Sequence, residues 1–211
     1  MSSTNTFDRL QSLALLVTDS FGTDASQNFD ESLHSAKDTV EQVVSTQKIV
    51  ADKESTTLSV ISAGFNYGDF AEVIFGQKIF LPKSFSKRGL YVLCLNIDHS
   101  SFYAWHFDFF PASTAQQTNL SFIQLIEKIP ANIYFTIVVK DDIFKHLNIS
   151  TKHFLAQVVG SKSIYNLRFR DSWAIVIHKP TISTYKVMAE SHNQTGIAQI
   201  KLEIYPPTKS I

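Results

Sequence analysis

Apolar residues in the first fifty positions recur at alternating steps of three and four, which is the spacing of one helix face. Residues 7–21 are predicted to form a first helix, which ends before Gly22. Residues 29–50 follow the alternation more strictly. The seam positions of this second segment are Phe29, Leu33, Ala36, Val40, Val43, Gln47 and Val50. Such a narrow seam is typical of a coiled coil, and β-branched seam residues are compatible with a trimer. The alternative is an amphipathic helix that packs on its own domain.

After the charged residues 52–55 the pattern changes to short runs of β-forming residues. The predicted strands cover residues 57–62, 70–75, 78–81, 90–97, 101–110, 133–139, 173–177, 185–189 and 197–205. The runs at 90–97, 133–139 and 173–177 are almost continuously apolar, which indicates strands buried on both faces.

Two helices are predicted between these strands. The first covers residues 120–128, with Thr118 or Asn119 as its N-cap and Pro130 as its stop. The second begins near residue 149 and ends at Gly160. The order of elements predicts an α+β fold, a mixed β-sheet domain flanked by helices. We expect three parts: a helical oligomerisation or attachment segment at 1–54, the α+β domain at 55–180, and a C-terminal strand pair at 181–211.

Composition excludes several classes of function. The chain has 211 residues, 44% of them hydrophobic, and a formal net charge of zero, so neither nucleic acid nor an anionic membrane is an expected partner. Its single cysteine, Cys94, excludes an internal disulfide and a site built from several thiolates. Neither a signal peptide nor a membrane-spanning run is recognised, so a virion or cytoplasmic location is expected.

Polar residues stand at the entrance of one buried strand and at the end of another. Arg170 and Asp171 precede Trp173 and the apolar run that follows it. One interpretation is a buried ion pair between Arg170 and Asp171, in which case Arg170→Ala would markedly lower stability. The other is a ligand site. Asp141 and Asp142 follow the run 133–139, at a carboxyl end of the kind where ligands bind in α/β sheets.

Several short motifs occur in a fixed order along residues 88–173. They are Arg88-Gly89-Leu90, Phe107-Asp108, Phe122 to Pro130, Val139-Lys140-Asp141-Asp142, Gly160-Ser161 and Phe169-Arg170-Asp171-Ser172-Trp173. Together they resemble the interleukin-like EMT inducer domain, also called the ILEI or PANDER-type domain. Residues 57–80 are similar to the N-terminal strands of that domain, so the resemblance covers roughly residues 57–180. The resemblance implies an α+β domain without catalysis, and the family includes secreted cytokine-like proteins and a glycan-binding stem domain attached to a glycosyltransferase.

In that glycan-binding branch an Asp and an Arg hold the sugar, and their counterparts here are Asp141 and Arg170. The remaining motif residues are expected to be structural. They are Arg88, Gly89, Asp108, Asp142, Gly160, Asp171 and Trp173.

The chain differs from the secreted members in lacking a recognised leader and their cysteines, and in having the heptad segment at 29–50. This organisation is similar to that of structural proteins of tailed phages. We therefore expect a non-enzymatic structural and interaction module that forms homo-oligomers and contacts other proteins, as a tail, neck or fibre component of a virion would.

Two alternatives remain open. One is a carbohydrate-binding module that uses Asp141 and Arg170, and the other is a hydrolase with Asp108 and Asp141 as general acid and base. The sequence contains no paired histidine spacing, glycine-rich phosphate loop or nucleophile elbow, so no metal and no cofactor is expected.

Overall fold

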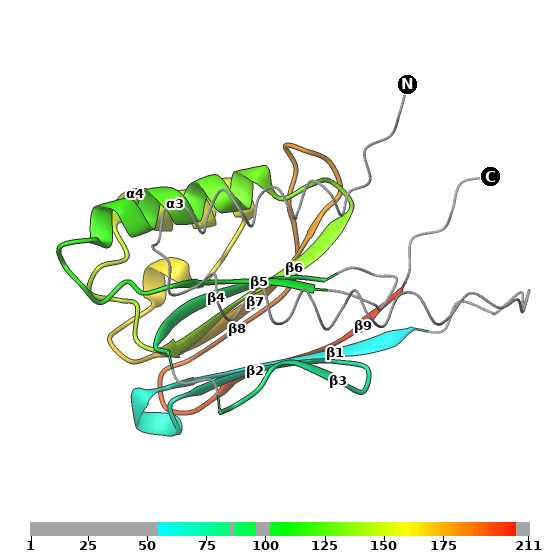
Figure 1. Cartoon of the computed structure of the whole chain (residues 1–211), viewed down its shortest axis with the longest axis horizontal. Helices are drawn as coiled ribbons and strands as arrows, with labels where there is room; N and C mark the ends of the chain where they lie inside the picture. Colours follow the sequence, from blue (N-terminus) through cyan, green and yellow to red (C-terminus); the bar gives the residue numbers. More distant parts are fainter. Residues whose placement is uncertain (1–54, 85–86, 96–101, 206–211) are drawn as a thin grey trace, which may run out of the picture. The chain divides into compact units, whose positions relative to one another are not determined.

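The computed structural model describes residues 55–84, 87–95 and 102–205 (Figure 1). The elements in chain order are β1 (Thr56–Gly64), the 3-10 turn η1 (Phe65–Tyr67), β2 (Phe70–Phe75), β3 (Lys78–Leu81), β4 (Gly89–Leu95), β5 (Phe102–Phe107), α3 (Ala115–Lys128), β6 (Ile133–Asp141), α4 (Ile149–His153), the π-helical turn η2 (Phe154–Val159), the 3-10 turn η3 (Ile164–Asn166), β7 (Ser172–Lys179), β8 (Lys186–Asn193) and β9 (Ala198–Ile204). The helices predicted at 7–21 and 29–50, with the coiled-coil seam, lie outside the described residues.

The strands form two stacked layers that are joined at one end (Figure 1). One layer has the order β5-β4-β6-β7-β8, and all its pairs are antiparallel. The other has the order β3-β2-β1-β9 and is also antiparallel. The layers join where the end of β1 runs parallel to the end of β6, with Ala63 opposite Lys140 and Gly64 opposite Asp141. The mixed sheet with few helices is the α+β class that the sequence predicts.

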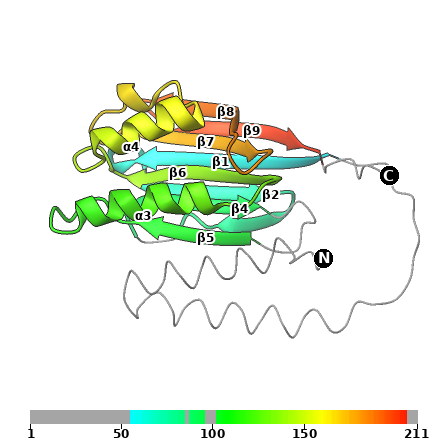
Figure 2. The ribbon, with the colours of Figure 1, turned by 90° about the horizontal axis from the view of Figure 1, so that it is seen from above.

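A hydrophobic core fills the space between the two strand layers. Leu58 and Val73 contribute to it from one layer and Leu93 and Val176 from the other, and all four are fully buried. The helices cover the opposite face of the larger layer (Figure 2), where Phe122 of α3 contacts Phe107 of β5 edge to face. Because β4 lies between helices and the second layer, all of its residues are buried, as its apolar run predicts.

Helix α3 begins at Ala115, earlier than the predicted Leu120, with Thr114 as its N-cap. The predicted cap Asn119 lies inside the helix instead, and its side chain is buried. Its Nδ2 donates to the carbonyl oxygens of Ala115 at 2.6 Å and His146 at 2.8 Å. Its Oδ1 accepts from the backbone N–H of Asn148 at 3.0 Å. Asn119 therefore joins α3 to the start of α4, which is why a capping residue type occurs within a helix.

The second predicted helix is confirmed as α4 followed by η2, and it ends at Gly160. This glycine has a φ of 96°, in the left-handed region that commonly ends helices. Within the described residues, no helix is long and apolar enough to cross a membrane.

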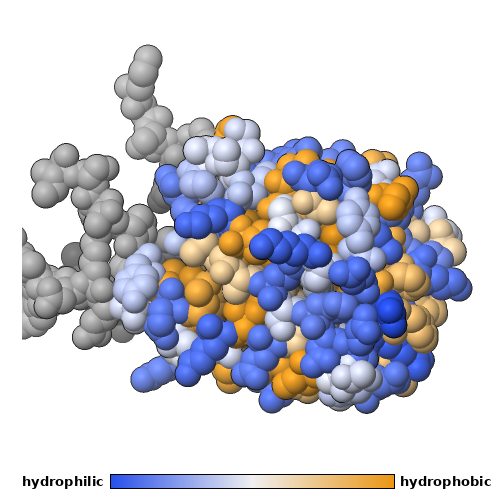
Figure 3. Space-filling view, turned by 180° about the vertical axis from the view of Figure 1, so that it is seen from behind, coloured by the Kyte–Doolittle hydropathy of each residue, from blue (hydrophilic) through white to orange (hydrophobic). Residues whose placement is uncertain are grey.

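The face of the domain in Figure 3 is mixed in character. Polar and charged side chains cover much of it, with apolar side chains between them.

Candidate functional site

The candidate site lies where the two strand layers join, at the ends of β1 and β6. Asp141 is opposite Gly64 of β1 on one side, and its neighbour Lys140 is opposite Gly89 of β4 on the other. A side chain at position 64 would place its Cβ 1.9 Å from the carbonyl oxygen of Arg170, so glycine lets the segment before β7 approach β1. Asp141 and Arg170, which are far apart in sequence, are thus brought to one edge. The edge is not that of a parallel sheet, so the sequence argument from parallel α/β folds does not apply to it.

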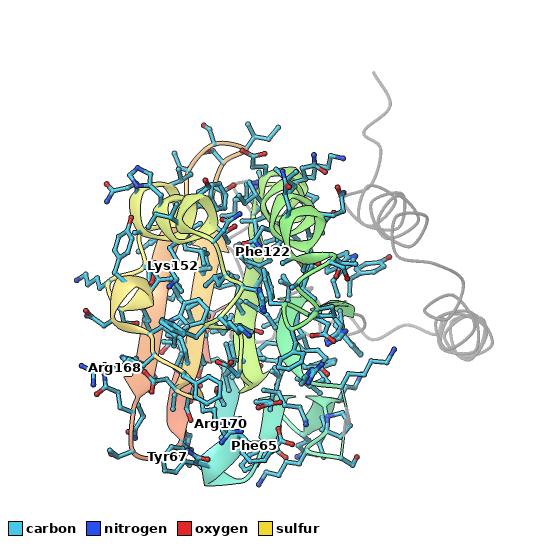
Figure 4. All side chains as sticks on the ribbon, turned by 90° about the vertical axis from the view of Figure 1, so that its left-hand side faces the viewer. Phe65, Tyr67, Phe122, Lys152, Arg168 and Arg170 are labelled. Atoms are coloured by element: carbon cyan, nitrogen blue, oxygen red, sulfur yellow. The ribbon has the colours of Figure 1, made fainter. Side chains whose placement is uncertain are left out.

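Arg170 lies on the surface of this edge, between two aromatic rings. Its guanidinium carbon is 4.1 Å from the ring centre of Phe65 and 4.7 Å from that of Phe169. Its Nη1 donates to Oδ1 of Asn66 at 3.4 Å, and its backbone N–H donates to Oδ1 of Asp142 at 3.1 Å. Both rings are about half exposed, at 50% and 56%. Figure 4 shows Phe65 beside Arg170 at the end of the domain away from the helices.

The predicted ion pair between Arg170 and Asp171 is wrong. Asp171 is buried, and its Oδ2 accepts from the backbone N–H of Arg168 at 2.8 Å and lies 2.7 Å from Nε2 of His192. Arg170 has a φ of 65°, and this left-handed backbone turns the chain between the two neighbouring side chains. The Asp171 carboxylate therefore links the start of β7 to β8, while the Arg170 guanidinium lies at the surface.

Ser172 and Trp173 fix the start of β7 against β1. Ser172 Oγ accepts from the backbone N–H of Gly64 at 2.9 Å and donates to the carbonyl oxygen of Gly196 at 2.7 Å. The backbone N–H of Trp173 donates to Ser62 Oγ at 2.9 Å. Both residues are fully buried, which makes them part of the scaffold of the edge.

Glu190 of β8 completes this scaffold, and no sequence motif points to it. Its carboxylate accepts hydrogen bonds from the hydroxyls of Ser161 and Ser163, the backbone N–H of Lys162 and Nε1 of Trp173. Burial alone would raise the pKa of Glu190, but these hydrogen bonds outweigh burial and hold the pKa below its ordinary value. Because its partners lie on other elements, no local spacing could identify it.

Asp141 differs from its neighbours in having a strained and partly exposed position. Its φ is 67°. Burial raises its pKa, the charges of Asp69 and Asp142 raise it further, and the guanidiniums of Arg88 and Arg170 oppose the rise. The carboxylate of Asp141 is thus a poorly stabilised anion that lies within electrostatic reach of two arginines.

The residues around Asp141 have structural roles. Asp142 is buried, and its Oδ1 accepts from the backbone N–H groups of Phe144 at 3.0 Å and Arg170. Lys140 is also buried, and its Nζ contacts Oδ1 of Asp69 at 3.1 Å. These contacts hold the backbone on both sides of Asp141.

Left-handed backbone is concentrated at this edge. Asp69, Asp141 and Arg170 have φ values of 51°, 67° and 65°. Such conformations cost roughly 1–2 kcal/mol for a residue with a side chain, and they persist where the surrounding structure fixes them, often at functional sites.

Arg88 and Asp108 lie on the β4 and β5 side of the same edge. The guanidinium carbon of Arg88 is 3.5 Å from the ring centre of Phe110. Asp108 Oδ1 lies 3.6 Å from Nε of Arg88 and accepts from the backbone N–H of Phe110 at 2.9 Å. Gly89, with a φ of 123°, is required because a Cβ would lie 2.2 Å from the carbonyl oxygen of Phe107.

In the described part of the chain, no group of three or more His, Cys, Asp and Glu side chains is placed to hold a metal ion. Cys94 is buried within β4, and burial raises the pKa of its thiol. The groups gathered at the edge are instead carboxylates, which accept hydrogen bonds, guanidiniums, which donate them, and aromatic rings, a set that suits recognition of a neutral polar ligand.

Comparison with known proteins gives one family. Residues 88–180 match the family model described as Interleukin-like EMT inducer, a narrower span than the motif resemblance over 57–180. No curated protein matches the chain. The match includes Asp141 and Arg170. It begins after β1, which supplies Gly64, and after the turn η1, which supplies Phe65.

Proposed function

Because the chain carries a domain of the interleukin-like EMT inducer family, we propose that it is a non-catalytic recognition module that binds carbohydrate with Asp141 and Arg170. The observation that carries this proposal is the position of the Arg170 guanidinium, which is held between two half-exposed rings on the edge that presents Asp141.

The chemistry of these groups fits a sugar. A carboxylate accepts hydrogen bonds from hydroxyl and acetamido N–H groups, and a guanidinium donates several in a fixed plane. Phe65 and Phe169 add exposed apolar surface, on which the C–H face of a pyranose ring can pack. The backbone at Asp141 and Arg170 is held by contacts with neighbouring segments, so little conformational entropy is lost when the ligand binds.

The test is a calorimetric titration of the full chain with N-acetylglucosamine. We expect saturable binding that weakens about tenfold or more in Asp141→Asn and in Arg170→Ala, because each change removes a charge-assisted hydrogen bond. Arg168→Ala is the matched control, because Arg168 is exposed nearby and its hydrogen bond to Asp171 comes from the backbone N–H, not from the side chain. Absence of binding by the wild type to this sugar and across a glycan array would contradict the proposal.

Arg170→Ala is no longer expected to lower stability markedly. Its guanidinium contacts are with an amide oxygen and two exposed rings, and cation–π contacts at exposed sites contribute about 0.5–1 kcal/mol. A loss of binding in this variant with a nearly unchanged melting temperature would therefore support a ligand site.

A second candidate function is assembly. The heptad pattern at 29–50 favours a homo-oligomer, and a trimer is compatible with its β-branched positions. Several linked copies would raise the avidity of a weak sugar site without any new contact. Such a protein would suit a phage virion that attaches to surface glycans. Its site of synthesis would then be the cytoplasm of the producing cell.

A further inference from the structure

The zero net charge of the whole chain conceals an uneven distribution along it. Residues 1–54 carry nine of the 19 acidic residues and four of the 19 basic ones, so the remainder of the chain has a net charge of +5. Within that remainder, the stretch between β6 and β7, residues 143–170, contains no Asp or Glu. Its basic residues are Lys145, Lys152, Lys162, Arg168 and Arg170. The total charge is therefore a poor guide to the partner of the surface that this stretch forms.

Residues 143–170 lie on the face of the larger strand layer that carries the helices, where they form α4, η2 and η3 (Figure 2). Lys145 and Lys162 are exposed, and Lys152 is partly exposed. In the part of the chain that the structure describes, none of these three lysines forms an ion pair. Their positive charges are thus available to a ligand.

The carboxylates that border this surface are bound within the fold. Asp142 and Asp171 are buried and accept hydrogen bonds from backbone N–H groups. Glu190 accepts from the backbone N–H of Lys162 and from two serine hydroxyls. Asp141 is partly exposed, but it lies on the edge that carries the proposed sugar site. The surface over α4 and η3 is therefore left basic.

Two exposed aromatic rings lie among these lysines. Phe144 is 37% exposed, and Nζ of Lys152 lies 4.5 Å from its ring centre. Tyr165 is 48% exposed, and its hydroxyl is 3.2 Å from Nδ1 of His153. Because Lys152 and His153 are neighbours in the last turn of α4, both rings lie beside that turn. Cations and rings thus share one surface.

We propose that this basic face, formed by Lys145, Lys152 and Lys162 with the rings of Phe144 and Tyr165, binds a single-stranded nucleic acid. Lysine ammonium groups suit the phosphates of its backbone, and an exposed ring provides a platform on which an unpaired base stacks. The rings favour this partner over an acidic protein or a sulfated polysaccharide, because carboxylates and sulfates would use the charges alone. No residue of the proposed sugar site takes part.

The test is fluorescence anisotropy of the full chain with a labelled oligothymidylate of about 16 nucleotides, the upper end of the site sizes of single-strand-binding folds. We expect saturable binding at low salt. The logarithm of the affinity should fall with the logarithm of the salt concentration with a slope of about −2, because each of three phosphate contacts adds about −0.7. Lys145→Ala and Lys162→Ala should each weaken binding and reduce the slope by about 0.7.

The contribution of the Tyr165 ring is measured with two substitutions. Tyr165→Leu should weaken binding about tenfold, because a stacked base loses its platform. Tyr165→Phe keeps the ring and removes only the hydroxyl that contacts His153, so it should bind as the wild type does. An abasic strand of the same length and charge tests stacking on the wild-type protein, and we expect it to bind about tenfold more weakly.

Lys201→Ala is the matched control. Lys201 is exposed on β9, in the other strand layer, so its removal lowers the net charge equally without touching the basic face. This variant should bind the oligothymidylate as the wild type does.

Each remaining outcome would overturn the proposal. Absence of binding by the wild type at low salt, or unchanged affinity in the lysine variants, would show that the basic face is not a nucleic-acid site. Equal affinity for the abasic strand would show that the face recognises charge alone, as an acidic protein or a sulfated polysaccharide would require. None of these results bears on the sugar site, because Asp141 and Arg170 are unchanged.

Discussion

Arg170 and Asp171 are neighbours in the chain, yet their side chains meet different surroundings. Asp171 is buried against His192, whereas Arg170 lies at the surface between two phenylalanine rings. The same division separates the buried Asp142 from the partly exposed Asp141. In both motifs one acidic residue fixes the backbone, and its neighbour is presented on the edge with left-handed φ.

Asp141→Asn is expected to raise stability slightly at neutral pH while weakening sugar binding. The folded-state pKa of Asp141 is raised, so its ionised form costs stability at any pH above that pKa, and the cost disappears as the pH falls through it. Asparagine removes the charge and tolerates the φ of 67°. Because solvent screens the charge of this partly exposed carboxylate, we expect a gain of at most about 0.5 kcal/mol, measured by chemical denaturation at pH 7.

The pH dependence provides the control for this prediction. The difference in unfolding free energy between the variant and the wild type should shrink as the pH falls toward the range in which Asp141 becomes protonated. A lower stability of the variant at pH 7 would mean that the carboxylate makes a favourable contact in the folded state.

Among the elements, the end of β1 has the tightest packing requirement at the candidate site. Gly64 pairs with Asp141, donates its N–H to Ser172 Oγ and lies under the Arg170 carbonyl. Its φ of −61° is ordinary for any residue, so only the space above its Cα requires glycine.

Gly64→Ala is expected to destabilise the domain by about 2–3 kcal/mol, because the new Cβ would lie 1.9 Å from a backbone oxygen that cannot move without displacing β7. Thermal and urea unfolding would measure this loss. Gly196→Ala is the matched control, because its Cβ would meet only the flexible side chain of Asn193, at 3.0 Å. Equal losses in the two variants would show that the approach of β1 to the Arg170 segment is not tightly packed.

The sequence predicted the individual elements better than their partners. Alternation and apolar runs predicted the described strands to within a few residues, because those patterns follow from burial of one or both faces. The start of α3 was missed because Thr114 makes no side-chain cap hydrogen bond and its neighbours resemble a loop. The division into two layers was also missed, because it depends on β1 pairing with β9 and β6, which lie far along the chain.

At the scale of the whole molecule, the candidate site combines parts from inside and outside the family match. Residues 88–180 contain Arg88, Asp141 and Arg170, whereas Phe65 comes from the turn after β1. The motifs could therefore point to the polar residues of the site. They include Phe169, one of the two rings beside Arg170, but they could not identify Phe65, because that contact exists only once β1 and β6 are joined.

The number of copies that present this site depends on whether residues 29–50 associate. If residues 29–50 form the seam of a coiled coil, Val43→Glu places a charge within it and should convert the homo-oligomer to a monomer. The mass of the full chain, measured by sedimentation or light scattering over a range of concentrations, tests this. Glu41→Ala, which changes an outward position of the same segment, should leave the mass unchanged.

Binding to an immobilised glycan surface links this oligomerisation to the sugar site. The Val43→Glu variant should bind such a surface more weakly than the wild type while keeping the same affinity per site for free sugar, because only avidity depends on linked copies. A wild-type chain that remains monomeric at high concentration would overturn the assembly proposal. The Asp141 and Arg170 site would then have to act as a single, monovalent contact.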